Sequence, residues 1–113
     1  MKRLILALAM VVMVSPAWGA VVFKNGNKLL SDCNESLGSH SEAFCIGYIM
    51  GVYDAIQSND GTLNGFTNCS GDFVVNGQIR DVVVKWLKDN PQHRHNGASG
   101  LISHALQEAF PCQ

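Results

Sequence analysis

The chain has 113 residues, which is enough for one domain and little more. Eight basic and nine acidic residues give a formal net charge of −1. This balance argues against a protein that tracks nucleic-acid phosphates, because that class is normally basic. The hydrophobic content of 47% is not evenly spread along the chain, because the first twenty residues hold much of the excess.

The first nineteen residues are predicted to be a secretory signal peptide. Lys2 and Arg3 precede the 11 apolar residues of Leu4–Val14, and Ala17 and Gly19 are the small residues that signal peptidase reads. The apolar run is shorter than the roughly 20 residues that span a bilayer, so a membrane anchor is the weaker alternative. Cleavage after Gly19 leaves an exported domain of 94 residues, 20–113, with six basic and nine acidic residues and a net charge of −3.

Hydrophobic periodicity predicts four helices and therefore an all-α fold. Ser39 and Glu42 fit a capping box before the second helix. The third helix is expected to end before Asn90-Pro91. The connection between the second and third helices is a long loop of about 18 residues that holds Cys69. Because the other connections are short, consecutive helices are expected to pack as antiparallel neighbours in a small bundle. The predicted helices span residues 27–34, 41–58, 77–89, and from 96 or 98 to 110.

Two glycines interrupt the second predicted helix. Gly47 and Gly51 lie one turn apart, and each costs about 1 kcal/mol relative to alanine. Their shared register predicts a face that another backbone approaches closely. A membrane-embedded helix pair is the alternative for this spacing, but Asp54 and Gln57 cut the apolar stretch short.

All four cysteines follow the predicted signal peptide, and an even number in an exported domain favours disulfide bonds. Four cysteines allow three pairings. The predicted helix order favours Cys33 with Cys45, where the first helix ends and the second begins. It also favours Cys69 with Cys112, where the third begins and the fourth ends. A metal site is disfavoured because there is no Cys-x-x-Cys pair, and a catalytic thiol would have to escape pairing.

Several segments together resemble one protein family. The stretch Cys45–Asp54 is similar to the signature Cys-x-Gly-Tyr-Ile-x-Gly-Val-x-Asp of the Rap/Tai family, bacterial periplasmic immunity proteins against type VI secretion amidases. One departure is Val75, which stands where the family often has a helix-capping threonine; Asn76 is the alternative cap. The other segments that carry the resemblance are Phe23–Leu30 with Cys33, Gly77–Val83, Asn90-Pro91, Arg94-His95 and Ala109–Cys112.

The resemblance implies a binding protein and not an enzyme. Such proteins, often homodimers, occlude the active site of a papain-like cysteine amidase that cuts peptidoglycan cross-links. The expected location is the periplasm and the expected partner is a cognate amidase effector. No cofactor, nucleic acid or membrane is expected to bind the mature domain. The alternative is a periplasmic helical stress protein or holdase-like chaperone. An enzyme is disfavoured because no nucleophile–base pair is evident.

The long loop is the first candidate for the partner-binding surface, because loops carry recognition more often than packed helices do. Phe66 is interpreted either as an aromatic anchor or as a cover for the core. The exposed face of the third helix is the second candidate, for the effector or for a dimer mate. The candidate loop residues are Asn59, Asp60, Asn64, Phe66 and Asp72.

The remaining motif residues are given structural roles. Tyr48 is expected to donate a hydrogen bond within the core. Asp54 and Arg94 are expected to form an ion pair or to cap helices, and His95 is grouped with them. The histidines His93, His95 and His104 are not expected to bind a metal, because no thiolate or carboxylate obviously completes a site.

Overall fold

The computed structural model of the chain describes residues 22–71 and 74–112, and in that part the domain is built from four α-helices. The predicted signal peptide and Asp72 lie outside the described residues. The all-α prediction is confirmed, and each helix boundary lies within two residues of its predicted position. The helices are α1 (Gly26–Cys33), α2 (His40–Ser58), α3 (Asn76–Asp89) and α4 (Ala98–Ala109).

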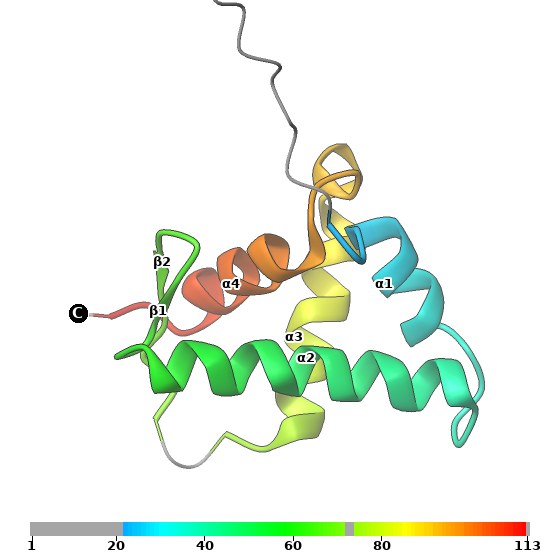
Figure 1. Cartoon of the computed structure of the whole chain (residues 1–113), viewed down its shortest axis with the longest axis horizontal. Helices are drawn as coiled ribbons and strands as arrows, with labels where there is room; N and C mark the ends of the chain where they lie inside the picture. Colours follow the sequence, from blue (N-terminus) through cyan, green and yellow to red (C-terminus); the bar gives the residue numbers. More distant parts are fainter. Residues whose placement is uncertain (1–21, 72–73, 113) are drawn as a thin grey trace, which may run out of the picture.

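The apolar faces of all four helices meet in one core. In Figure 1 the long helix α2 runs along one side, α4 lies beside it, α3 crosses behind, and α1 covers the end near the start of α2. None of the described helices is long and apolar enough to cross a membrane. The largest fully buried apolar side chains are Leu29, Ile49, Ile56, Ile79, Val83, Leu87, Ile102 and Leu106.

Polar side chains cap the N-termini of two helices. The Asn25 side chain accepts a hydrogen bond from the Lys28 amide at 2.9 Å and so caps α1. The Ser39 hydroxyl accepts one from the Glu42 amide at 3.1 Å and caps α2. The predicted capping box is therefore only half formed, because the Ser39 amide donates to the Ser36 carbonyl at 3.0 Å and not to Glu42.

The long connection after α2 contains a small β-hairpin that the sequence reasoning missed. Strands β1 (Thr62–Leu63) and β2 (Phe66–Thr67) pair antiparallel. Asn64 and Gly65 join them with φ angles of 53° and 79°. Two left-handed residues in a two-residue loop match the twist of a hairpin, and an Asn-Gly pair adopts this turn at low cost.

Both predicted disulfides are confirmed. Cys33 pairs with Cys45 and Cys69 pairs with Cys112, and the chain has no free cysteine among its four. The first bond joins the end of α1 to the first turns of α2. The second ties the segment after the hairpin to the chain end after α4. The two bonds therefore hold opposite ends of the bundle.

The segment before α4 packs against the start of α1. It follows a short 3-10 helix, η1 (Pro91–His93), that was not predicted. The Gly26 amide donates to the Asn96 carbonyl at 3.0 Å and the Asn27 amide to the Arg94 carbonyl at 2.9 Å. A Cβ atom on Gly26 would lie 2.9 Å from the Arg94 carbonyl oxygen. Only glycine therefore permits this close approach.

Candidate functional site

The hairpin of β1 and β2 is the first candidate site, and its backbone is tightly constrained. Asp60 and Gly61 both have positive φ angles, 54° and 77°, where the chain leaves α2. The Asn59 side-chain amide donates to the Thr62 carbonyl at 2.6 Å. The Asn68 amide donates to the Gly61 carbonyl at 2.7 Å and closes the base of the hairpin. The hairpin is therefore a defined projection and not an open loop.

Helix α4 anchors this hairpin through three kinds of contact. The Phe66 ring stacks on His104, with ring centroids 4.7 Å apart. The Thr67 amide donates to the Gln107 side chain at 2.9 Å. The Cys69 amide donates to the Phe110 carbonyl at 2.9 Å, beside the disulfide to Cys112. These contacts fix the position of the hairpin relative to the core.

The hairpin contact continues into an aromatic cluster that links α4 to α3. His104 lies 5.0 Å from Trp86 between ring centroids. Glu108 joins the two rings, because one carboxylate oxygen accepts a hydrogen bond from the Trp86 indole at 2.7 Å and the other lies 3.2 Å from the His104 ring nitrogen. Phe66 is half-buried at the edge of this cluster. Of the two interpretations of Phe66, the structure therefore favours a ring that covers the core over a ring that stands free as an anchor.

The structure brings most of the predicted loop residues together. Asn59, Asp60 and Asn64 are exposed on the hairpin or at its base. Asn64 and Phe66 also line an open cavity of about 410 Å³ together with His93, Asn96 and His104. Sequence reasoning missed the two histidines as neighbours of the loop, because they come from η1 and α4 and no spacing signal connects them to it.

Tyr48 does not make the core hydrogen bond expected of it. Its ring is half-buried against the core, and its hydroxyl has no hydrogen-bond partner among the described residues. Burial raises the pKa of the Tyr48 hydroxyl above its ordinary value of 10.0. Its ring instead faces a cation, since the Lys24 ammonium lies 5.6 Å from the ring centroid.

The other motif residues separate in space. Asp54 is exposed on α2 and pairs with no cation among residues 22–71 and 74–112. The expected ion pair between Asp54 and Arg94 is therefore absent there, and Asp54 lies inside α2 and caps no helix. Arg94 acts through its backbone carbonyl, which receives the Asn27 amide. His95 is exposed in the same segment. Among residues 22–71 and 74–112, neither Asp54 nor Arg94 makes the side-chain contact expected of it.

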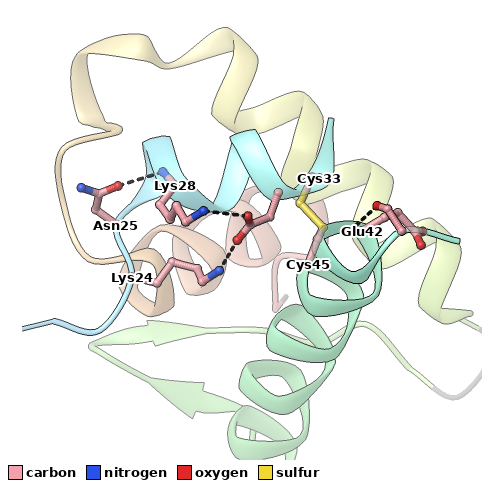
Figure 2. A network of polar contacts seen from close by, with 8 residues as sticks. Lys24, Asn25, Lys28, Cys33, Glu42 and Cys45 are labelled. Carbon is pink, nitrogen blue, oxygen red and sulfur yellow. Dashed lines mark hydrogen bonds and ion pairs between the residues drawn. A yellow bond between two sulfur atoms is a disulfide. The ribbon is translucent and has the colours of Figure 1, made fainter. Parts of the chain in front are cut away.

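A second site, not found from the sequence, surrounds Asp32 at the start of the bundle (Figure 2). The Asp32 carboxylate accepts hydrogen bonds from the Lys24 ammonium and, at 3.1 Å, from the Lys28 ammonium. Lys24 and Asp32 are each only 5% exposed. Burial acts to raise the pKa of Asp32, but the two lysines outweigh it and the pKa lies below the ordinary 3.8. The Lys24 ammonium also lies 4.1 Å from the centre of the Phe44 ring.

No part of the described chain gathers three histidine, cysteine or carboxylate side chains as a metal site would require. Both disulfides consume the thiols that a nucleophilic site would use. The described surface does carry large exposed aromatic side chains, Phe23 and Phe44, and aromatic residues are enriched at protein-binding surfaces.

Comparison with known proteins agrees with a recognition role. The family model described as Rap1a immunity proteins matches residues 25–112, which covers all four helices, the hairpin and both disulfides. No curated protein sequence matches the chain closely enough to count as a relative.

Proposed function

Because the chain belongs to the Rap1a family of immunity proteins, we propose that it is exported to the periplasm, where it neutralises a type VI secretion effector that cleaves peptidoglycan. An immunity protein binds a cognate effector protein. The finer proposal is that this effector is a cysteine amidase and that binding occludes its active-site cleft. The observation that carries the proposal is the family match over residues 25–112, which leaves almost none of the folded domain unexplained.

The disulfides support the proposed location. Disulfides persist in oxidising compartments such as the bacterial periplasm and are rare in the cytosol. Both bonds of this chain are formed, and one of them lies at the surface. The sequence also predicts a signal peptide before residue 20. An export route and an oxidising destination would together account for these features.

The hairpin supports the proposed mode of binding. It is narrow, projects beside the end of α2 (Figure 1), and carries the exposed side chains of Asp60 and Asn64. Because α4 and a disulfide already hold it in place, docking would cost little conformational entropy. A protective complex with nanomolar affinity requires about −12 kcal/mol of binding free energy, and such preorganisation contributes to it.

The direct test mixes the purified chain, beginning at Ala20, with the cognate cysteine amidase effector that the proposal assigns to it. We expect excess chain to abolish cleavage of purified peptidoglycan by that amidase. Unhindered cleavage at excess chain would overturn the proposal. Binding to many unfolded clients, with no effect on the amidase, would favour the chaperone alternative in its place.

The binding surface is tested by paired single substitutions. Asn64→Gly removes the side chain at the hairpin tip without adding strain, because glycine tolerates a φ of 53°. We expect it to weaken inhibition about tenfold, which corresponds to about 1.4 kcal/mol. Lys88→Ala changes the exposed face of α3 and should leave inhibition unchanged. The opposite pattern would move the effector contact from the hairpin to α3.

A homodimer is also part of the proposed function. The resemblance to the Rap/Tai family implies it, and the exposed Phe23 and Phe44 side chains supply apolar surface that such a pairing could cover.

A further inference from the structure

A cleft at the start of α2 carries a charge opposite to that of the whole domain. It has a volume of about 350 Å³ and lies between Lys28 on α1 and Phe44 on α2, and we name it the lysine cleft. The ammonium groups of Lys24 and Lys28 share the one carboxylate of Asp32, which is the only acidic side chain among the described residues that line the cleft. The lysine cleft therefore keeps one positive charge, whereas the domain that follows the predicted signal peptide has a net charge of −3.

Lys28 is the accessible part of this positive charge. Its side chain is 65% exposed, whereas that of Lys24 is 4% exposed and is held against Asp32 (Figure 2). An exposed ion pair within one helix is worth little, so the Lys28 ammonium can turn from Asp32 to another carboxylate at small cost. His40 is exposed and lines the same cleft. An incoming carboxylate would match the two lysines with two carboxylates.

Aromatic rings form another part of the wall of the lysine cleft. Phe23 is 84% exposed and Phe44 is 48% exposed, and their ring centroids lie 6.3 Å apart. The Phe44 ring is held in place by the Lys24 ammonium, which lies 4.1 Å from its centre. Large exposed aromatic side chains are typical of protein-binding surfaces and unusual on an isolated domain. The cleft therefore offers an apolar contact directly beside a cationic one.

The lysine cleft continues into an apolar groove along α2. This groove has a volume of about 470 Å³, shares His40 and Phe44 with the cleft, and extends to Gly47 and Tyr48. A Cβ atom on Gly47 or Gly51 would meet no other described atom within 4 Å, so the close backbone approach predicted from their spacing is not made within the described chain. From His40 to Tyr48 the helix rises about 12 Å, which is the length of roughly four extended residues.

Charge and apolar surface together select one kind of occupant for the lysine cleft. A small anion would leave the rings of Phe23 and Phe44 uncovered. A purely apolar segment would leave the Lys28 charge without a partner, and a cationic segment would be repelled by it. Complementary charge gives an interface its specificity. The chemistry that fits is a short extended protein segment with a carboxylate beside an aromatic or large aliphatic side chain.

We propose that the lysine cleft binds an acidic, apolar segment of a protein partner. In the bound form the carboxylate of the segment pairs with Lys28, and its apolar side chain packs against Phe23 and Phe44. The cleft lies at the start of α2, whereas the hairpin lies beside the end of α2 (Figure 1). The proposal therefore adds a second recognition surface to the domain, separate from the proposed effector contact.

The test titrates the chain that begins at Ala20 with three synthetic peptides, each blocked at both ends, and follows the titration by NMR. The peptides are Asp-Leu-Phe, Lys-Leu-Phe with the charge reversed, and Asp-Ser-Ser without the apolar side chains. We expect Asp-Leu-Phe to shift the signals of Lys28, His40 and Phe44, and to bind roughly tenfold more tightly than either of the other peptides. Equal binding of Lys-Leu-Phe or Asp-Ser-Ser, or no shift with any peptide, would overturn the proposal.

Two matched variants locate the charge that binds the peptide. Lys28→Gln and Lys85→Gln each remove an exposed lysine that pairs with an aspartate four residues later in a helix. Lys28→Gln should weaken the binding of Asp-Leu-Phe several-fold, and Lys85→Gln on α3 should leave it unchanged. Equal effects of the two variants would overturn the proposal.

The same spectra show whether a second copy of the chain occupies the lysine cleft. Signals of Phe23 and Phe44 that move with the concentration of the chain, in the absence of peptide, would assign the cleft to pairing of two copies and overturn the proposal. We expect these signals to stay in place. The assay contains no effector, so its failure would leave the proposed inhibition untouched.

Discussion

At the scale of single residues, the ion pair between Lys24 and Asp32 is a contact that the domain can lose only at a large cost in stability. Both groups are withdrawn from water, and each lone charge would cost several kcal/mol if its partner were removed. The Phe44 ring gives the Lys24 ammonium a second favourable contact at 4.1 Å. The cluster therefore links the chain before α1, α1 itself and the first turns of α2 through one buried charge.

Replacing Asp32 with asparagine should be strongly destabilising. The amide keeps the shape of the side chain but leaves the Lys24 ammonium buried without a counter-charge, so we expect a loss of about 3 kcal/mol in the free energy of unfolding at pH 7. Lys28→Ala is the control. Lys28 is exposed, and its bond to Asp32 should be worth less than about 1 kcal/mol. Urea unfolding of the three chains measures both differences. Equal losses of unfolding free energy in the two variants would contradict the conclusion that the buried Lys24, and not the exposed Lys28, is the partner that makes Asp32 important.

The same pair predicts how stability depends on pH. The pKa of Asp32 is below 3.8 in the folded chain, so the carboxylate stabilises the fold above its unfolded pKa, and that contribution disappears as the pH falls through the folded value. The difference in stability between the original chain and Asp32→Asn should therefore shrink below about pH 4. Urea unfolding at pH 7 and pH 3 tests this, and a difference that stays constant would contradict it.

At the scale of elements, α3 lacks the cap that α2 has. Ser39 caps α2, whereas Val75 before α3 has no side-chain acceptor, is 63% exposed, and already has the extended backbone that a capping residue adopts. The Asn76 side chain accepts a hydrogen bond from the Gly77 amide at 2.9 Å, so it satisfies one of the free amides but not from the capping position. One capping side chain is therefore missing from this helix.

Val75→Ser should supply that side chain and raise the stability of the domain. A serine cap is worth about 1 kcal/mol, which corresponds to a rise of roughly 4–8 °C in melting temperature for a domain of this size. Val75→Ala removes the same exposed valine without adding an acceptor and should bring no such gain. Thermal unfolding followed by circular dichroism distinguishes them, and identical melting temperatures would show that the cap contributes nothing.

The elements also show which parts of the fold the sequence could predict. The helices were predictable because their apolar residues repeat at helical spacing, and the disulfides followed from the helix order. The hairpin was missed because its strands are two residues long, too short for an alternating pattern, although Asn64-Gly65 is a turn signal. The cluster at Asp32 and the contact of Phe66 with His104 were missed because residues distant in the chain form them. The exposure of Gly47 and Gly51 depended on how α2 was rotated in the bundle, which the spacing left open.

At the scale of the whole molecule, the two disulfides have different surroundings. Cys33 and Cys45 are buried, and Figure 2 shows their disulfide at the same end of the bundle as Lys24 and Lys28. Cys69 and Cys112 are exposed at the other end, beside the hairpin. The proposed effector contact lies at the hairpin, so the disulfide beside that surface is the one that is open to reagents.

Mild reduction of the native chain should therefore open the bond between Cys69 and Cys112 first. In the chain-entropy model this bond, which closes 43 residues, is worth roughly 4 kcal/mol, and the bond that closes 12 is worth roughly 3 kcal/mol. A domain with a total stability of about 5–15 kcal/mol would stay folded after losing the first. Alkylation and peptide mass spectrometry should find label on these two cysteines while Cys33 and Cys45 remain paired. Hydrogen exchange should then quicken at the Cys69 amide, which donates to Phe110, and remain slow in α1 and α2. Simultaneous release of all four thiols would mean that the hairpin and the helical core unfold as one unit.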